Sequence, residues 1–308
     1  MKFEAANMKT SFSVSFALVA AVGLLAVGNT GCNKTSADAP PVNPKWVSTM
    51  RESKAAGGGA GGDAESGSGW GTLKGVFTFT GTPRTMGAID TQKDPLCKVK
   101  IYYEQVRVNP SNKGLRDVLI YARKVPRVTP DYDPKVAKDA IFDQRDCRYL
   151  DHVFASSLKD NFTILNSDDT AHNSKGEPPG GNKTYNEQLA PKTGKFQYGL
   201  FKKAFANPYS VSCAIHPWMV GYHIVRPDPY FAVTNENGEF TIEKLPAGTK
   251  LEFQVWHERG AGENGGLQAK LVGDDKFVWK PEGRFFATVP ENGELKMEIQ
   301  VEESALLK

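Results

Sequence analysis

From Trp70 onward, the sequence consists of short apolar or alternating runs that turn residues interrupt before any run reaches helical length. Runs rich in Val, Ile, Phe, Tyr and Thr are typical of strands, and Gly, Pro and Asn are typical of the turns between them. The chain carries 30 glycines and 19 prolines in 308 residues, and its turns include Asn237-Gly238 and Pro246-Ala247-Gly248. This punctuation predicts an all-β chain built from sandwiches or barrels.

The expected strands lie at 73–80, 118–123, 161–165, 196–201, 210–215, 220–225, 231–234, 239–242, 251–256, 285–289 and 295–301. The one helical candidate is a short segment near Pro134–Ile141. Residues 173–195 are polar and rich in Gly and Pro, which predicts a long surface loop between two strands.

The charge balance argues against one class of partner. Lys and Arg number 38 and Asp and Glu 35, so the formal net charge is +3. Nucleic-acid binding needs a concentrated basic surface to neutralise phosphates, so we expect no nucleic-acid partner.

The first 31 residues are expected to be an export signal, because Lys9 precedes an apolar run that ends in small residues. The exit Asn29-Thr30-Gly31-Cys32 resembles the lipobox of bacterial lipoproteins. That resemblance implies a lipid on Cys32, which then becomes the first residue of the mature chain and its membrane anchor. An ordinary cleaved signal with an incidental Cys32 is the alternative.

Residues 32–69 are expected to form a flexible tether. They include the glycine-rich stretch 57–62 and the Ser-Gly repeat 66–69, and they hold few apolar side chains. Such a segment buries too little apolar area to offset the entropy lost on ordering. With the lipid anchor, the tether would hold the folded part at the periplasmic face of a membrane.

A cluster of soft and borderline metal donors occurs near residue 215. Cys213, His216 and Met219 lie three residues apart, and His172 follows the strand expected at 161–165. A thiolate, an imidazole and a thioether together suit copper in both oxidation states, whereas Met is a poor zinc ligand. Two His and one Cys with a weak axial Met are the ligands of a blue-copper site, so the sequence predicts copper as the cofactor.

At these positions the chain resembles the cupredoxins, and most of all the amicyanin and plastocyanin group, over roughly residues 140–226. The residues that carry the resemblance are Asn166, Asp168, His172, Asn173, Cys213, His216 and Met219. The resemblance implies a Greek-key sandwich in which His172, Cys213 and His216 are strong ligands and Met219 is the weak axial one. It also implies single-electron exchange with redox partner proteins, without turnover of a substrate. The whole arrangement resembles bacterial proteins described as methylamine-utilisation-like.

A second module is indicated on both sides of that region. Gly238-Glu239-Phe240 followed by Leu245-Pro246-Ala247-Gly248 resembles the carboxypeptidase-regulatory-like β-sandwich, and Gly71–Val76 resembles its first strand. The resemblance implies that residues 70–139 and 227–308 form this sandwich and that the cupredoxin domain, 140–226, is inserted into it. One enlarged cupredoxin with extra strands is the alternative.

The cysteine count suggests one disulfide, because export permits disulfides. If Cys32 carries a lipid and Cys213 binds the metal, Cys97 and Cys147 form the natural pair, although spacing alone leaves other pairings open. Closing a loop of about 50 residues would add roughly 3–4 kcal/mol to the free energy of unfolding.

Two other functions stay open at this point. One is copper storage or delivery, and the other is a metal-free adhesion or scaffold module. The other histidines are expected to be structural, with His152 and His223 on strand faces and His257 at a strand end.

Overall fold

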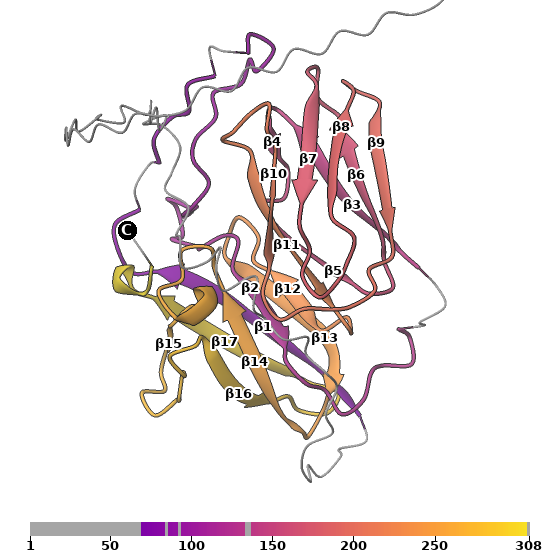
Figure 1. The fold of residues 1–308 in the computed structure, drawn as a ribbon. Helices are drawn as coiled ribbons and strands as arrows, with labels where there is room; N and C mark the ends of the chain where they lie inside the picture. The colour runs from indigo at the N-terminus through magenta and orange to yellow at the C-terminus, as the bar shows by residue number, and fades with distance from the viewer. Residues whose placement is uncertain (1–68, 84–85, 92–93, 133–136, 307–308) are drawn as a thin grey trace, which may run out of the picture. The chain divides into compact units, whose positions relative to one another are not determined.

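The structure is a computed structural model that describes residues 69–83, 86–91, 94–132 and 137–306 (Figure 1). The predicted export signal, Cys32 and the predicted tether up to residue 68 lie outside the described residues. Within the described ranges, no helix is long and apolar enough to cross a membrane.

The described chain is built almost entirely from strands, which confirms the predicted all-β class. The strands are β1 Trp70–Phe79, β2 Leu119–Ala122, β3 Asp139–Arg145, β4 Arg148–Tyr149, β5 Val153–Ser157, β6 Asn161–Asn166, β7 His172–Gly176, β8 Tyr185–Leu189, β9 Gly194–Gly199, β10 Tyr209–Ser212, β11 Val220–Arg226, β12 Phe231–Val233, β13 Glu239–Pro246, β14 Lys250–Trp256, β15 Lys270–Leu271, β16 Arg284–Thr288 and β17 Glu294–Val301. Two 3₁₀ helices, η1 Glu263–Gly265 and η2 Glu303–Ala305, complete the secondary structure of these residues.

Strands β3 to β11 form one sandwich. One of its sheets has the strand order β5-β11-β10-β7-β8, and the other has the order β4-β3-β6-β9 (Figure 1). Phe142 and Phe162 from one sheet and Val211 and Ile224 from the other belong to a single apolar core. Along β3 and β6 every second residue faces this core, as expected where one face of a sheet is buried.

The remaining strands form a second sandwich, with sheets β13-β1-β17-β15 and β12-β2-β14-β16. Its core includes Leu73, Phe77, Phe253 and Phe285. Strand β1 pairs in parallel with β17, so segments from the beginning and the end of the described chain lie side by side. In the sequence, the strands of this second sandwich lie on both sides of β3 to β11, with β1 and β2 before them and β12 to β17 after them. The domain limits 70–139, 140–226 and 227–308, and the likeness to the regulatory-like family, stay predictions.

Two local predictions were wrong. The helix predicted near 134–141 is not formed where the structure describes it: positions 139–141 belong to strand β3, in which Ala140 and Phe142 are buried and Ile141 between them is exposed, which is the period of a strand. Positions 134–136 lie outside the described residues. Residues 173–195 are not one loop but contain most of β7, all of β8 and the start of β9. The hairpin runs from the pair His172 and Leu189 to the pair Gly176 and Tyr185. Tyr185 and Leu189 are buried in the apolar core, which holds this otherwise polar segment as a strand.

Candidate metal centre

The loop between β10 and β11 carries three of the four predicted ligands. Cys213 directly follows β10, and Met219 directly precedes β11. Because β10 and β11 are antiparallel neighbours, the two ends of the loop meet: the Cys213 N–H donates to the Met219 carbonyl at 3.1 Å. The Met219 N–H donates in turn to the carbonyl of His216 at 2.8 Å, so the loop is a tight turn with a defined shape.

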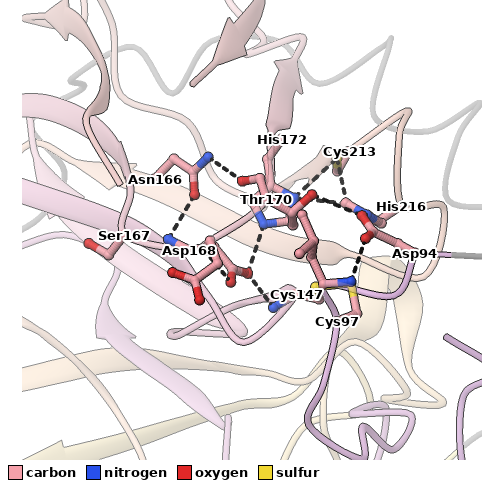
Figure 2. Close-up of polar contacts among 12 residues, drawn as sticks. Asp94, Cys97, Cys147, Asn166, Ser167, Asp168, Thr170, His172, Cys213 and His216 are labelled. Atoms are coloured by element: carbon pink, nitrogen blue, oxygen red, sulfur yellow. Dashed lines mark hydrogen bonds and ion pairs between the residues drawn. A yellow bond between two sulfur atoms is a disulfide. The ribbon is translucent and has the colours of Figure 1, made fainter. Parts of the chain in front are cut away.

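His172 reaches the same place from a neighbouring strand. It is the first residue of β7, which pairs with β10. Its Nδ1 atom lies 2.8 Å from the Nδ1 of His216, and the Cys213 sulfur lies 4.0 Å from the former and 3.9 Å from the latter (Figure 2). The structure therefore brings together His172, Cys213 and His216, with all three side chains buried.

These donor positions fit a single metal ion. Metal bonds of about 2.0 Å to imidazole nitrogen and about 2.3 Å to thiolate sulfur span donors at such separations. The second ring nitrogens of both histidines contact carboxylates, so with a metal ion bound each ring would donate from Nε2 and bind the ion through Nδ1. Without an ion, an Nδ1 proton can be donated to the Cys213 sulfur instead. Two lone pairs that face each other at 2.8 Å are stabilised by a cation between them.

Met219 is buried in the same apolar core as Cys213, and its backbone closes the loop. The predicted axial role of its thioether remains part of the functional proposal. A soft donor set of thiolate, imidazole and thioether suits copper better than zinc.

Each histidine has its own carboxylate partner. His172 Nε2 lies 2.9 Å from Asp168 Oδ2, and His216 Nε2 lies 2.8 Å from Asp94 Oδ2 (Figure 2). Such partners orient a ligand imidazole and increase its basicity. No contact between Asp168 and His172 was predicted from the sequence, and sequence reasoning missed Asp94, which lies 122 residues from His216 and in no recognisable motif.

Asn173 joins the two ligand segments. Its backbone N–H donates to the Cys213 sulfur at 3.4 Å, and its side-chain oxygen accepts the N–H of Ala214. Its amide nitrogen donates to Asn186 on β8 at 2.7 Å. The side chain is therefore held on both sides, which limits movement of the sulfur relative to His172.

The electrostatics of the site favour a thiolate. Burial raises the pKa of Cys213, but hydrogen bonds with His172 and His216 outweigh it and lower the pKa to about 6. Burial lowers the pKa of His216, and the contacts with Cys213 and Asp94 raise it above its ordinary value. The thiolate is the form of cysteine that binds metal.

The disulfide lies against this site. The structure joins Cys97 and Cys147, with their Cα atoms 5.6 Å apart. Ligand atoms of both cysteines lie within 4.8 Å of a ring nitrogen of His216. Among the described cysteines Cys213 is the one with a free thiol.

The other three histidines take structural positions. His223 on β11 stacks on Phe162 with ring centroids 4.4 Å apart, and burial lowers its pKa to about 3. His257 follows β14 and is buried, which lowers its pKa to about 4. His152 lies just before β5 rather than on a strand face, and its Nε2 contacts Glu258 at 2.5 Å.

No protein-family model and no curated protein matches the chain. Among solved structures, amicyanin from Paracoccus versutus is 18% identical, with 35% of this chain and 97% of that chain covered at a TM-score of 0.24. A reduced Cu(I) form of an amicyanin mutant is 19% identical, with 33% and 97% covered at a TM-score of 0.25. A copper-containing nitrite reductase from Thermus scotoductus is 16% identical, with 28% of this chain and 22% of that chain covered at 0.25. Likenesses at these TM-scores carry no functional weight, and the donor atoms themselves indicate the chemistry of the site.

Proposed function

We propose that this protein is an exported one-electron carrier whose redox centre is a single copper ion held by His172, Cys213 and His216, with Met219 as the weak axial ligand. The observation that carries the proposal is the convergence of two Nδ1 atoms and one sulfur, from two separate segments, within 4.0 Å of one another. Copper bound there supplies a one-electron couple between Cu(II) and Cu(I).

The chain's own contribution is a rigid, dry set of donors. Paired strands hold both ends of the 213–219 loop, and Asn173 ties that loop to His172. Donor atoms that keep their positions in both oxidation states reduce the movement of ligands that electron transfer requires, so the transfer is faster. Burial also keeps water from the donors, because the exposed fraction is 2% or less for His172, Cys213 and His216.

The same burial favours electron transfer over the other functions considered. A substrate must reach the metal to be transformed, whereas an electron crosses a short layer of protein. A delivery protein must release its ion, and a donor set enclosed on all sides opposes release. We therefore infer that the protein is not an enzyme and that its partners are redox proteins. Export, a lipid on Cys32 and the periplasmic face of a membrane belong to this proposal on sequence grounds.

An optical spectrum tests the proposal. The purified chain is loaded with Cu(II) and compared with the Cys213→Ser variant. We expect an intense absorption at about 600 nm from a Cys–Cu(II) bond, lost in the variant, and a reversible one-electron potential. Copper bound only as Cu(I), without that band, would instead support delivery, and no copper uptake would support a metal-free scaffold.

A further inference from the structure

The partner of His216 comes from outside the sandwich that supplies the ligands. Asp94 lies in the segment between β1 and β2, before β3 begins. Its Oδ2 atom is 2.8 Å from His216 Nε2 and accepts the Thr170 hydroxyl at 2.9 Å, while its Oδ1 atom accepts the Leu96 N–H at 2.9 Å. Both oxygens are therefore directed, and the carboxylate has a defined orientation toward the imidazole.

Covalent attachment holds this segment in place. Cys97 lies three residues after Asp94, donates its N–H to the Asp94 carbonyl at 3.0 Å, and is bonded to Cys147. The Cys147 N–H donates to Asp168 Oδ2 at 2.6 Å, and Asp168 is the partner of His172. One disulfide thus connects the carboxylate partners of both histidines (Figure 2).

Trp218 completes the connection from the ligand loop. Its indole N–H donates to the Cys147 carbonyl at 3.0 Å. The centroids of the Trp218 and His216 rings lie 5.0 Å apart. With Asp94 on one side and Trp218 on another, His216 keeps only 1% of its surface exposed. The edge of the ring that faces away from the metal donors meets a carboxylate rather than water.

We propose that Asp94 is a positioning residue for the copper centre, which holds the His216 ring and makes its Nδ1 atom a stronger donor. This inference rests on the proposed function. An imidazole that donates to a carboxylate is more basic, and a more basic ligand stabilises Cu(II) more than Cu(I). The segment around Asp94, although not part of the sandwich that binds the ion, therefore sets part of the reduction potential.

The test compares Asp94→Asn with Asp139→Asn in the full chain. An asparagine in place of Asp94 keeps the shape of the side chain and loses its charge, and Asp139 is an exposed carboxylate at the start of β3 that controls for net charge. We expect the Cu(II) affinity of Asp94→Asn to fall about 10- to 100-fold, as for other partners of metal ligands. Each tenfold decrease in the ratio of Cu(II) affinity to Cu(I) affinity raises the reduction potential by about 59 mV. The control is expected to keep the wild-type affinity and potential.

A second measurement uses the metal-free protein. Exchange of the His216 Nε2 proton with water, followed by NMR, is expected to be slow in the wild type and at least about tenfold faster in Asp94→Asn, since a buried proton on a carboxylate partner is protected. If Asp94→Asn does not fold, Thr170→Val removes one hydrogen bond to the same carboxylate without a change in charge, and faster exchange is again expected.

The outcomes separate the two proposals. An Asp94→Asn variant that keeps the absorption band but matches Asp139→Asn in potential and wild type in proton exchange overturns the role of Asp94 and leaves the electron carrier standing. A wild-type chain without the band or a reversible potential overturns the proposed function, and this inference with it.

Discussion

The Nδ1 atoms of His172 and His216 lie 2.8 Å apart, although 44 residues separate them in the chain. One begins β7 and the other lies in the turn between β10 and β11, so the pairing of β10 with both neighbouring strands creates the contact. The Cys213 sulfur is about equally distant from both nitrogens, which makes the three atoms one potential ligand set.

Replacement of Met219 by Leu is expected to shift the reduction potential upward without loss of the Cys–Cu(II) absorption. A weak axial ligand tunes the couple, and removal of a soft electron donor disfavours Cu(II). Met and Leu have similar volumes, so the free energy of unfolding should fall by less than about 1.5 kcal/mol. Cyclic voltammetry measures the shift.

The matched control for that variant is Met297→Leu, because Met297 is equally buried but lies on β17 in the other sandwich. It should leave the potential unchanged. Equal potentials in Met219→Leu and wild type would exclude Met219 as a ligand.

Replacement of both Cys97 and Cys147 by Ser is expected to destabilise the protein by roughly 3–4 kcal/mol, because the disulfide restricts an unfolded loop of about 50 residues. Urea unfolding under non-reducing conditions measures the change. The variant should also shift the copper potential in the same direction as Asp94→Asn, since Cys97 tethers the Asp94 segment. Loss of stability with an unchanged potential would show that Asp94 keeps its place without the disulfide.

The stabilising contribution of His152 should be lost as the pH rises from 6.5 through 9, because the pKa of His152 is higher in the folded protein than in the unfolded chain. The lowered pKa of Cys213 acts in the opposite direction over the same range, so the contribution of His152 is measured as the difference between wild type and a His152 variant. Burial lowers the pKa of His152, but Glu258, Asp117 and Glu104 outweigh it and raise the pKa to about 9. The unfolded histidine loses its proton near 6.5, so the stabilising contribution is complete below that pH and is lost as the folded group titrates. The loss is on the order of 3 kcal/mol for a shift of this size.

Urea unfolding at several pH values, with His152→Gln as the comparison, tests that expectation. The variant should be less stable than wild type at pH 6, and this difference in stability should shrink between pH 7 and 9. Parallel profiles for the two proteins would mean that another group, and not the His152–Glu258 pair, titrates in this range.

Much of the architecture follows from local pattern. Strand β17, for example, alternates buried and exposed positions from Met297 to Val301, and such alternation leaves few choices besides a strand. The same reasoning failed for β3 and for the β7–β8 hairpin. Around Ile141 the two-residue period of a strand is evident only once the burial of Ala140 and Phe142 is known. On β8 the residues between Tyr185 and Leu189 are polar, and only these two end residues are buried.

The donor types of the candidate site could be read from the residues, because thiolate, imidazole and thioether chemistry belongs to Cys213, His216 and Met219 wherever they lie. The spacing of three residues also places them within one turn. The surroundings of the donors could not be predicted. Asp94 is an ordinary carboxylate in sequence, and only its contact with His216 distinguishes it.

The strand-forming pattern and the chemical identity of the donors were evident in the sequence, since both are properties of single residues and their near neighbours. The approach of His172 to His216 and the Cys97–Cys147 pair were predicted from the sequence, and both are present in the structure. The contacts of Asp94 and Asp168 with the two imidazoles became evident only in the folded chain. The difference comes from separation along the chain. Strand pairing and a covalent bond bring together groups that lie far apart in the chain, and no local propensity records which distant groups will meet.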